Sequence, residues 1–228
     1  MSFKTVKLLL RSLPYLRREQ LLYRPLRLAQ FRLYKTFPQT ASRYVATPKS
    51  TPRPSSQAIE IIRSALKTFH HFTRPLAEYD SLLANLLEDR FTFLNHTLEI
   101  KSIDWNRRYV GHLWNYQFHY FGYAVPCARA FVEHDDANIM QKCQALIESW
   151  IDNARIGQSD GWDAYPISLR TVNWIYAYVL LAESYKDREF IARLSTSIYQ
   201  QLEFLSSHLE YHLLSNHLLE NAKALVIG

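Results

Sequence analysis

The sequence predicts an all-α protein of antiparallel helix pairs with one short β-hairpin. The chain has 228 residues, 48% of them hydrophobic, which is enough to bury a sizeable core. Only five glycines occur, fewer than the turns of a sheet-rich domain of this length would need. Apolar side chains recur at intervals of three and four over most of the chain, and the connections between these stretches are short.

Residues 1–36 are predicted to form a basic amphipathic arm of one or two helices, broken near Pro14 and Pro25. Glu19 is the only acidic residue in this arm, which carries most of the net charge of +6. Such an arm could bind anionic lipid, nucleic acid or an acidic polymer, or could be a solvated helix face. The apolar patch at residues 6–10 is too short for a signal-peptide core, and no run is long enough to cross a membrane.

Residues 37–57 are rich in Pro, Ser and Thr and lack apolar periodicity, which predicts a linker or an extended wrap. Residues 58–228 are predicted to form the main domain. Its first two helices are indicated by apolar stripes at helical spacing, made of Ile61, Ile62, Ala65, Leu66 and Phe69, and then of Leu82, Leu83, Leu86 and Leu87.

The rest of the main domain is predicted to be one hairpin and a series of helices. Residues 91–100 alternate apolar and polar side chains around Asn95-His96, as a hairpin does. Pro166 suits the first turn of a helix, and Asp187 suits an N-cap. Cys127 and Cys143 lie in apolar surroundings, so we expect buried thiols. Helical spacing covers residues 113–134, 137–151, 166–185, 188–205 and 218–227, the last with an unmatched apolar face that suggests a truncated chain.

A first candidate site segment, residues 112–121, is dense in polar rings. A helix would place Tyr116, His119 and Tyr120 on one face. These rings could stack on a sugar, or they could form an aromatic seam between helices with their polar tips hydrogen-bonded.

In the second segment, residues 161–174, Trp162 and Tyr165 are predicted to lie on a loop just before a helix. Arg170 lies on the otherwise apolar part of this helix and needs an anionic partner if it is buried. That partner could be a substrate carboxylate or sulfate, or an acid within the protein.

The third segment, residues 208–221, gathers Asn216, His217 and Glu220 at the start of a helix. His217 and Glu220 are three residues apart and so share a face. Alternatively, Ser215 or Asn216 caps the helix and His217 is a core imidazole. We predict no metal, because no second ligand set of matching spacing is present. The sequence also has no glycine-rich phosphate loop, nucleophile elbow or Cys-x-x-Cys motif.

Together the stretches LWNYQFHYFGY, WDAYPISLRTVNWI and LEYHLLSNHLLENAKALV resemble the N-terminal domain of the heparinase II/III family of bacterial polysaccharide lyases, in particular the heparan sulfate and alginate lyases. The resemblance implies an incomplete (α/α) toroid of helix pairs around a canyon for an acidic polysaccharide, followed by a β-sandwich domain beyond this chain. It implies a reaction without a cofactor, in which a uronic acid loses its C5 proton and the 4-linked group leaves by β-elimination.

The resemblance also implies roles for particular residues. Asn216 would bind the substrate carboxylate and stabilise the enolate-like intermediate. His217 would contact the carboxylate or transfer a proton, and Glu220 could orient its imidazole. Arg170 and Tyr165 would line the canyon, with Trp162, Tyr116, His119 and Tyr120 as further substrate contacts. The family's catalytic Tyr and second His would lie beyond residue 228, so we expect this chain alone to be inactive.

The sequence is also compatible with two functions other than a lyase. One is a noncatalytic toroid that binds acidic glycan during polysaccharide assembly near a membrane, with the basic arm as a peripheral membrane contact. The other is a helical scaffold whose arm binds lipid or nucleic acid, which rests on charge alone; nucleic acid is not among the expected partners. The resemblance suggests a periplasmic protein, whereas the lack of an export signal leaves a cytoplasmic location open. The sequence does not identify the polysaccharide.

Overall fold

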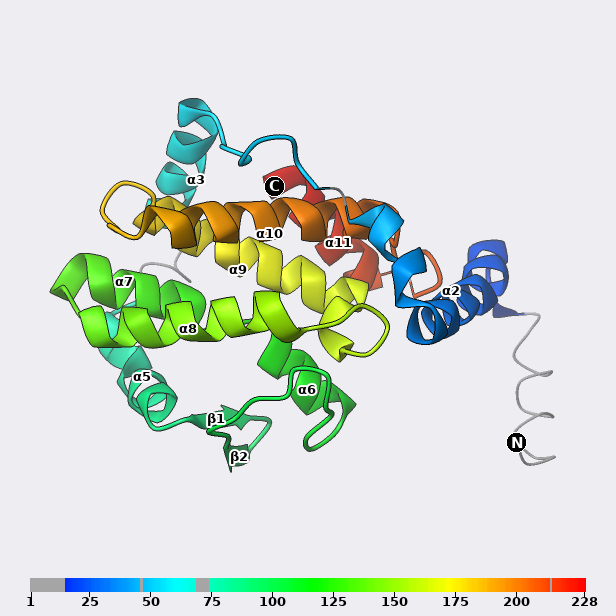
Figure 1. Cartoon of the computed structure of the whole chain (residues 1–228), viewed down its shortest axis with the longest axis horizontal. Coiled ribbons are helices and arrows are strands. Elements are labelled where there is room, and N and C mark those ends of the chain that lie inside the picture. Colours follow the sequence, from blue (N-terminus) through cyan, green and yellow to red (C-terminus); the bar gives the residue numbers. More distant parts are fainter. Residues whose placement is uncertain (1–14, 46, 69–73, 214) are drawn as a thin grey trace.

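The computed structural model describes residues 15–45, 47–68, 74–213 and 215–228. Helices dominate it, and the described residues contain one two-stranded sheet, so the all-α prediction is confirmed. Successive helices fold back on one another as in part of an (α/α) toroid (Figure 1). The helices are α2 (Arg18–Thr36), α3 (Ser56–Thr68), α5 (Asp80–Leu87), α6 (His112–His119), α7 (Ala124–His134), α8 (Ala137–Asn153), α9 (Ala164–Leu181), α10 (Arg188–Ser206) and α11 (Ser215–Ile227).

Helix α9 is the centre of the molecule and contacts α3, α6, α7, α10 and α11. It is apolar around most of its circumference, which is typical of a helix enclosed by other helices. Trp174 and Ile167 on α9 are fully buried, as are Phe190 on α10 and Ile139 on α8. The core therefore surrounds α9.

Short connections join α7 to α8 and α9 to α10, and side-chain caps set where the second helix of each pair begins. Asp187 accepts a hydrogen bond from the backbone N–H of Phe190 at 2.9 Å, so the predicted N-cap is confirmed. Asp136 caps α8 in the same way through Ile139. Asp135, which precedes it, has a φ of 56° and ends α7 in the left-handed conformation.

The hairpin consists of β1 (Arg90–Phe93) and β2 (His96–Glu99), paired antiparallel with Phe93 opposite His96. Its turn is Leu94-Asn95, one residue earlier than predicted. Both turn residues have positive φ, 51° and 62°, as a two-residue hairpin turn of type I′ requires. Asn tolerates this conformation well, and Leu94 is held in it by the strand pairing.

Helix α2 runs without interruption through Pro25, so the predicted break at this residue is wrong. Pro25 removes one helical hydrogen bond, but the residues before and after it continue the same packed face. Tyr34 on that face is buried and its hydroxyl lies 2.7 Å from Nε2 of His208, at the end of α10. The predicted break at Pro14 lies outside the described residues.

Residues 113–134 do not form the single helix predicted. The chain leaves α6 after His119, passes through Phe121 at a φ of 52°, and begins α7 at Ala124. Phe121 is fully buried against Trp105 and Trp174, which stabilises the left-handed residue between the two helices. The left-handed Phe121 therefore divides this stretch into two helices.

Two predicted apolar stripes are only partly buried. In α3 Leu66 is buried, but Ile61 is 62% exposed. In α5 Leu83 and Leu86 are buried, and the outer members of the stripe, Leu82 and Leu87, are exposed. Phe69 lies outside the described residues. Cys127 and Cys143 are free and buried, as predicted.

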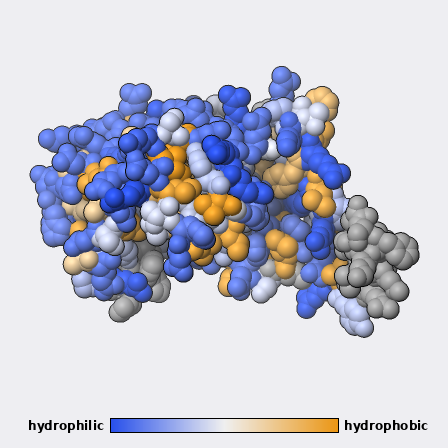
Figure 2. Space-filling model, turned by 90° about the horizontal axis from the view of Figure 1, so that it is seen from below, coloured by the Kyte–Doolittle hydropathy of each residue, from blue (hydrophilic) through white to orange (hydrophobic). Residues whose placement is uncertain are grey.

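Hydrophilic side chains dominate the face shown in Figure 2, with apolar ones gathered in several patches between them. Among the helices that the structure describes, none is both long enough and apolar enough to cross a membrane.

Candidate functional site

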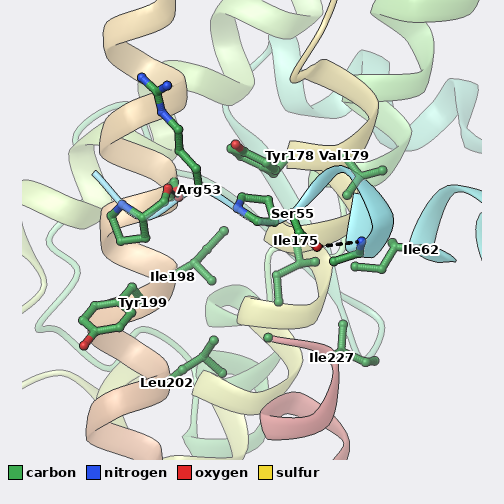
Figure 3. A pocket seen from close by; sticks show the side chains of 15 residues that line it. Arg53, Ser55, Ile62, Ile175, Tyr178, Val179, Ile198, Tyr199, Leu202 and Ile227 are labelled. Carbon is green, nitrogen blue, oxygen red and sulfur yellow. Dashed lines mark hydrogen bonds between the residues drawn. The ribbon is translucent and has the colours of Figure 1, made fainter. Parts of the chain in front are cut away.

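Two of the hollows formed by the described residues differ in their linings. One, of about 350 Å³, is enclosed by the segment at residues 52–58, by α9 and α10, and by the last residues of the chain. Its lining is largely apolar, with Ile175, Ile198 and Leu202 inside and the Arg53 side chain extending away along α10 (Figure 3). It does not share a lining residue with the second, more polar hollow, which is lined by the predicted site residue Tyr116.

Five aromatic rings from three helices lie in sequence across the surface beside the polar hollow. Neighbouring ring centroids are 4.1 Å apart for His112 and Tyr116, 6.4 Å for Tyr116 and Tyr120, 6.0 Å for Tyr120 and Tyr165, and 4.3 Å for Tyr165 and His217. We call this series the ring row. It brings Tyr116, Tyr120 and Tyr165 of the predicted substrate contacts together with the predicted catalytic residue His217.

At one end of the ring row, His217 is held by a buried carboxylate. Its Nδ1 lies 3.1 Å from Oε1 of Glu210. Asn221 donates to the other oxygen of Glu210 at 3.1 Å, and its own carbonyl oxygen accepts from the Glu210 backbone at 2.9 Å. With Nδ1 donating to the carboxylate, Nε2 of His217 carries the free lone pair of a general base.

Burial raises the pKa of Glu210, and the neighbouring His217 and Asn221 partly offset this effect. Sequence reasoning had assigned the orienting role to Glu220. In the structure Glu220 instead forms an ion pair with Lys223, one helical turn further along α11. Glu210 was missed because it lies on the segment before α11, where helical spacing says nothing about contact with His217. The available signal was that Glu210 is the only acidic residue in the HLEYHLL stretch just before α11.

Asn216 precedes His217 in the first turn of α11 and is exposed. Its side chain has no hydrogen-bond partner among the described residues, so the amide is free to bind a ligand. The helix begins at Ser215, which has a φ of 49°. The predicted alternative in which His217 is a core imidazole does not describe this site, since His217 is only half-buried and lies against the ring of Tyr165.

Arg170 is fully buried and does not reach the ring row. Its guanidinium donates to Oε1 of Gln201 at 2.8 Å and to the backbone oxygens of Gly161 at 2.9 Å and His119 at 3.1 Å. It also lies over the ring of Trp150, 3.8 Å from the centroid, and burial lowers its pKa. These contacts use its donors inside the protein, and no acidic side chain of the described residues pairs with it. Arg170 thus joins the end of α6 to the loop before α9 and to α10.

His119 and Trp162 also belong to the core rather than to the ring row. His119 is 1% exposed and accepts a hydrogen bond from Trp150 at its Nδ1. Burial lowers its pKa to about 3, with the charge of Arg170 acting in the same direction, so the imidazole is neutral. A Cβ on Gly161 would lie 2.6 Å from Nδ1 of His119, which explains the glycine there. The predicted shared face of Tyr116, His119 and Tyr120 therefore holds for the two tyrosines only.

At the other end of the ring row lies a second polar cluster that sequence reasoning missed. Tyr116 donates to Asp163 at 2.5 Å, and His112 lies 3.8 Å from the same carboxylate oxygen. Burial raises the pKa of Tyr116, and the negative charge of Asp163 adds to the effect, so this phenol stays protonated. Arg108 makes a two-point contact with Asp160 at 2.6 and 2.8 Å. Although burial opposes it, this contact lowers the pKa of Asp160.

The cluster contains residue types that bind metals, but its carboxylate oxygens already accept hydrogen bonds from neighbouring side chains. Ligand atoms of His112, Asp160 and Asp163 lie within 4.8 Å of one another. Arg108 engages both oxygens of Asp160, and Tyr116 donates to Asp163. An ion-pair network explains these residues, and we assign no metal to them.

Comparison with known proteins gives one match. A family model described as the heparinase II/III N-terminus matches residues 39–228, which is most of the chain. The chain belongs to the heparinase II/III family. No curated protein and no solved structure matches it. The match relates the chain to polysaccharide lyases, confirms the resemblance seen in the three motifs, and covers every residue of the ring row. The match to the heparinase II/III N-terminus begins inside the predicted linker. Helix α2 precedes the matched region.

Proposed function

We propose that the ring row binds a uronic-acid-containing polysaccharide and that the chain serves its cleavage by β-elimination. The observation that carries this proposal is the arrangement at the start of α11. There, the exposed amide of Asn216 lies next to an imidazole that Glu210 holds against the ring of Tyr165. The family membership supports the same reaction class.

The chemistry of β-elimination explains why an amide and an imidazole belong together here. The C5 proton of a uronic acid is weakly acidic because the adjacent carboxylate already carries a negative charge. A hydrogen bond from the Asn216 amide to that carboxylate would stabilise the additional charge as the proton leaves. Nε2 of His217 would then contact the carboxylate or take up the proton. Tyr120 and Tyr165 would stack on the sugar rings that approach this point.

Glu210 and Arg170 would act as positioning residues. Glu210 fixes the ring and the tautomer of His217, the role first expected of Glu220. Arg170 would support the site from inside the protein, because its hydrogen bonds hold the segments that carry Tyr120 and Tyr165. His119 and Trp162 would contribute to the same support rather than to direct contact with sugar.

The proposal is tested by replacing Asn216 and measuring glycan binding to the 228-residue chain. Oligomannuronate and a heparan sulfate hexasaccharide serve as probes, with tryptophan fluorescence or calorimetry as the readout. We expect Asn216→Ala to weaken binding of the preferred probe about tenfold, the value of one hydrogen bond to a charged group. Asn138→Ala is the matched control, because Asn138 is also exposed and is the second residue of its helix. Equal affinity of Asn216→Ala and the wild type would refute the assignment.

The same probes separate a lyase from a noncatalytic glycan-binding toroid. Cleavage by β-elimination produces an unsaturated uronic acid that absorbs ultraviolet light. Product formation that is lost in His217→Ala would support a lyase. Binding without product, in a protein that includes the family's catalytic Tyr and second His, would favour the noncatalytic alternative.

We further propose a peripheral membrane contact through the outward face of α2. Leu22, Leu26 and Leu33 recur on that face and are 69%, 48% and 44% exposed. The exposed side chains of Arg18 and Arg32 lie on the same helix, so the face combines apolar and cationic groups as interfacial helices do. Co-sedimentation with anionic vesicles tests the proposal, and equal recovery with and without vesicles would exclude it.

A further inference from the structure

The polar hollow lies between α2 and the ring row and has a volume of about 500 Å³. We call it the α2 cavity. It shares His112 and Tyr116 with the ring row and Glu210 with the support of His217. Four side chains of α2 form its other wall: Arg24, Arg27, Leu28 and Phe31.

Arg27 is positioned in this wall with part of its hydrogen-bonding capacity unused. It is only 7% exposed and donates to Gln30 at 2.7 Å and to the backbone oxygens of Ser207 and Leu209 at 3.1 and 3.3 Å. Its buried Nε has no acceptor among the described residues. A buried donor without a partner is unusual in a folded protein and indicates a place for an acceptor.

A second buried nitrogen in the lining is also without a partner. His212 lines the cavity, and its Nδ1 finds no hydrogen-bond partner in the part of the chain that the structure describes. Burial lowers the pKa of His212, and the charges of Arg27 and Arg24 lower it further. The neutral imidazole can offer a hydrogen bond without adding charge.

The lining carries three arginines and three acids, but α2 contributes two of the arginines and none of the acids. Asp160 is engaged by Arg108, Asp163 by Tyr116, and Glu210 by His217 and Asn221. Arg24 is exposed and forms no ion pair with any described residue. Arg24 and Arg27 therefore make the α2 wall cationic, and neither forms an ion pair with a described residue; both lie on a helix that precedes the family match.

We infer that the α2 cavity is an anion-binding subsite in which Arg24 and Arg27 bind a carboxylate or sulfate of an acidic glycan. The inference rests on the proposed function, because the glycan would reach the cavity along the ring row that shares Tyr116 and His112 with it. A planar or tetrahedral oxyanion matches guanidinium donors, and the acids on the opposite side suit sugar hydroxyls. Helix α2 adds to the family domain a wall that selects acidic sugars.

The test compares Arg24→Gln with Arg32→Gln in the 228-residue chain. Both arginines are exposed residues within α2, but only Arg24 lines the cavity, so the two variants remove the same charge from different faces. Probes are a heparan sulfate hexasaccharide, its fully desulfated form and a neutral cellohexaose. We expect Arg24→Gln to weaken binding of an acidic probe about tenfold and Arg32→Gln to leave it within about twofold. Cellohexaose binding should be the same in both variants.

The two acidic probes identify the anion. A loss in Arg24→Gln confined to the sulfated probe assigns the subsite to sulfate, and an equal loss with the desulfated probe assigns it to carboxylate. Equal losses in Arg24→Gln and Arg32→Gln would overturn the inference, because general charge attraction would then explain them. Unchanged binding in Arg24→Gln with a loss in Asn216→Ala would overturn the subsite but keep the proposed function. No binding of any acidic probe by the wild type would overturn both.

Discussion

At the residue scale, the site depends on buried polar groups whose partners are inside the protein. Glu210 is 6% exposed, yet it accepts hydrogen bonds from His217 and Asn221 and so holds an imidazole at the surface. Arg170 is fully buried and joins three segments through its guanidinium. Buried polar networks of this kind fix geometry when all members are satisfied and are costly when one is removed.

Replacing Glu210 with Gln should change how stability depends on pH. Burial raises the pKa of Glu210, so in the wild type its contribution to stability is present below the ordinary pKa of Glu and is lost as the pH rises through the raised value. Glu210→Gln removes this dependence while keeping the shape. Denaturant unfolding from acidic to neutral pH should therefore show a smaller decline in the variant. Glu203→Gln, which alters an exposed carboxylate, is the control. Parallel pH curves for wild type and Glu210→Gln would contradict the assignment.

Arg170→Met should lower the free energy of unfolding by roughly 2–4 kcal/mol, because it leaves Gln201 and two backbone oxygens without donors. Arg170→Lys should recover little of this loss, since an ammonium group cannot reproduce the guanidinium fork. Arg155→Met, at an exposed loop position, should stay within about 0.5 kcal/mol of the wild type. Equilibrium denaturation measures all three, and a neutral Arg170→Met would show that the network is not supporting the loop.

At the element scale, α2 has two faces with different partners. Its inward face packs through Tyr34 and Arg27 against the end of α10, and the same side forms a wall of the α2 cavity. Its outward face carries exposed leucines and arginines. Pro25 does not interrupt either face, because the inward packing continues on both sides of it. A single helix can therefore contribute to ligand binding and to a surface contact.

The outward face leads to a prediction about vesicle binding. The double variant Leu22→Ser/Leu26→Ser should bind vesicles of phosphatidylcholine and phosphatidylglycerol at least about tenfold more weakly, since burial of each leucine is worth about 1.5–3 kcal/mol. The matched control, Leu87→Ser/Leu113→Ser, changes two exposed leucines on other helices. Both proteins should be recovered equally without vesicles. Equal losses in the two double variants would exclude a specific role for α2.

At the scale of the whole molecule, the fold brings three distant segments to one surface. Tyr116 and Tyr120 come from around α6, Tyr165 from the start of α9 and His217 from the start of α11. The ends of these helices meet because α9 packs against both α6 and α11 in the centre of the molecule. The central helix thus positions the ring row while remaining buried itself.

Much of the fold follows from local sequence. Helical spacing predicted α8 and α10 closely, and Asp187 was recognised as a cap, because periodicity and capping depend on neighbours within one turn. The break between α6 and α7 was not predictable, since the left-handed Phe121 is stabilised by rings from other parts of the chain. The continuity of α2 through Pro25 likewise goes with contacts that Arg27 and Tyr34 make, beyond the proline, to the segment that follows α10.

The sequence by itself determined the helical class, the family and the segments that carry Tyr165, Asn216 and His217. Only the tertiary structure decided that Arg170 turns into the core and that Glu210, not Glu220, holds His217. The physical reason is that spacing along a helix fixes which side chains share a face. Which side chains pack against that face, and whether they are polar, depends on segments far away in the chain.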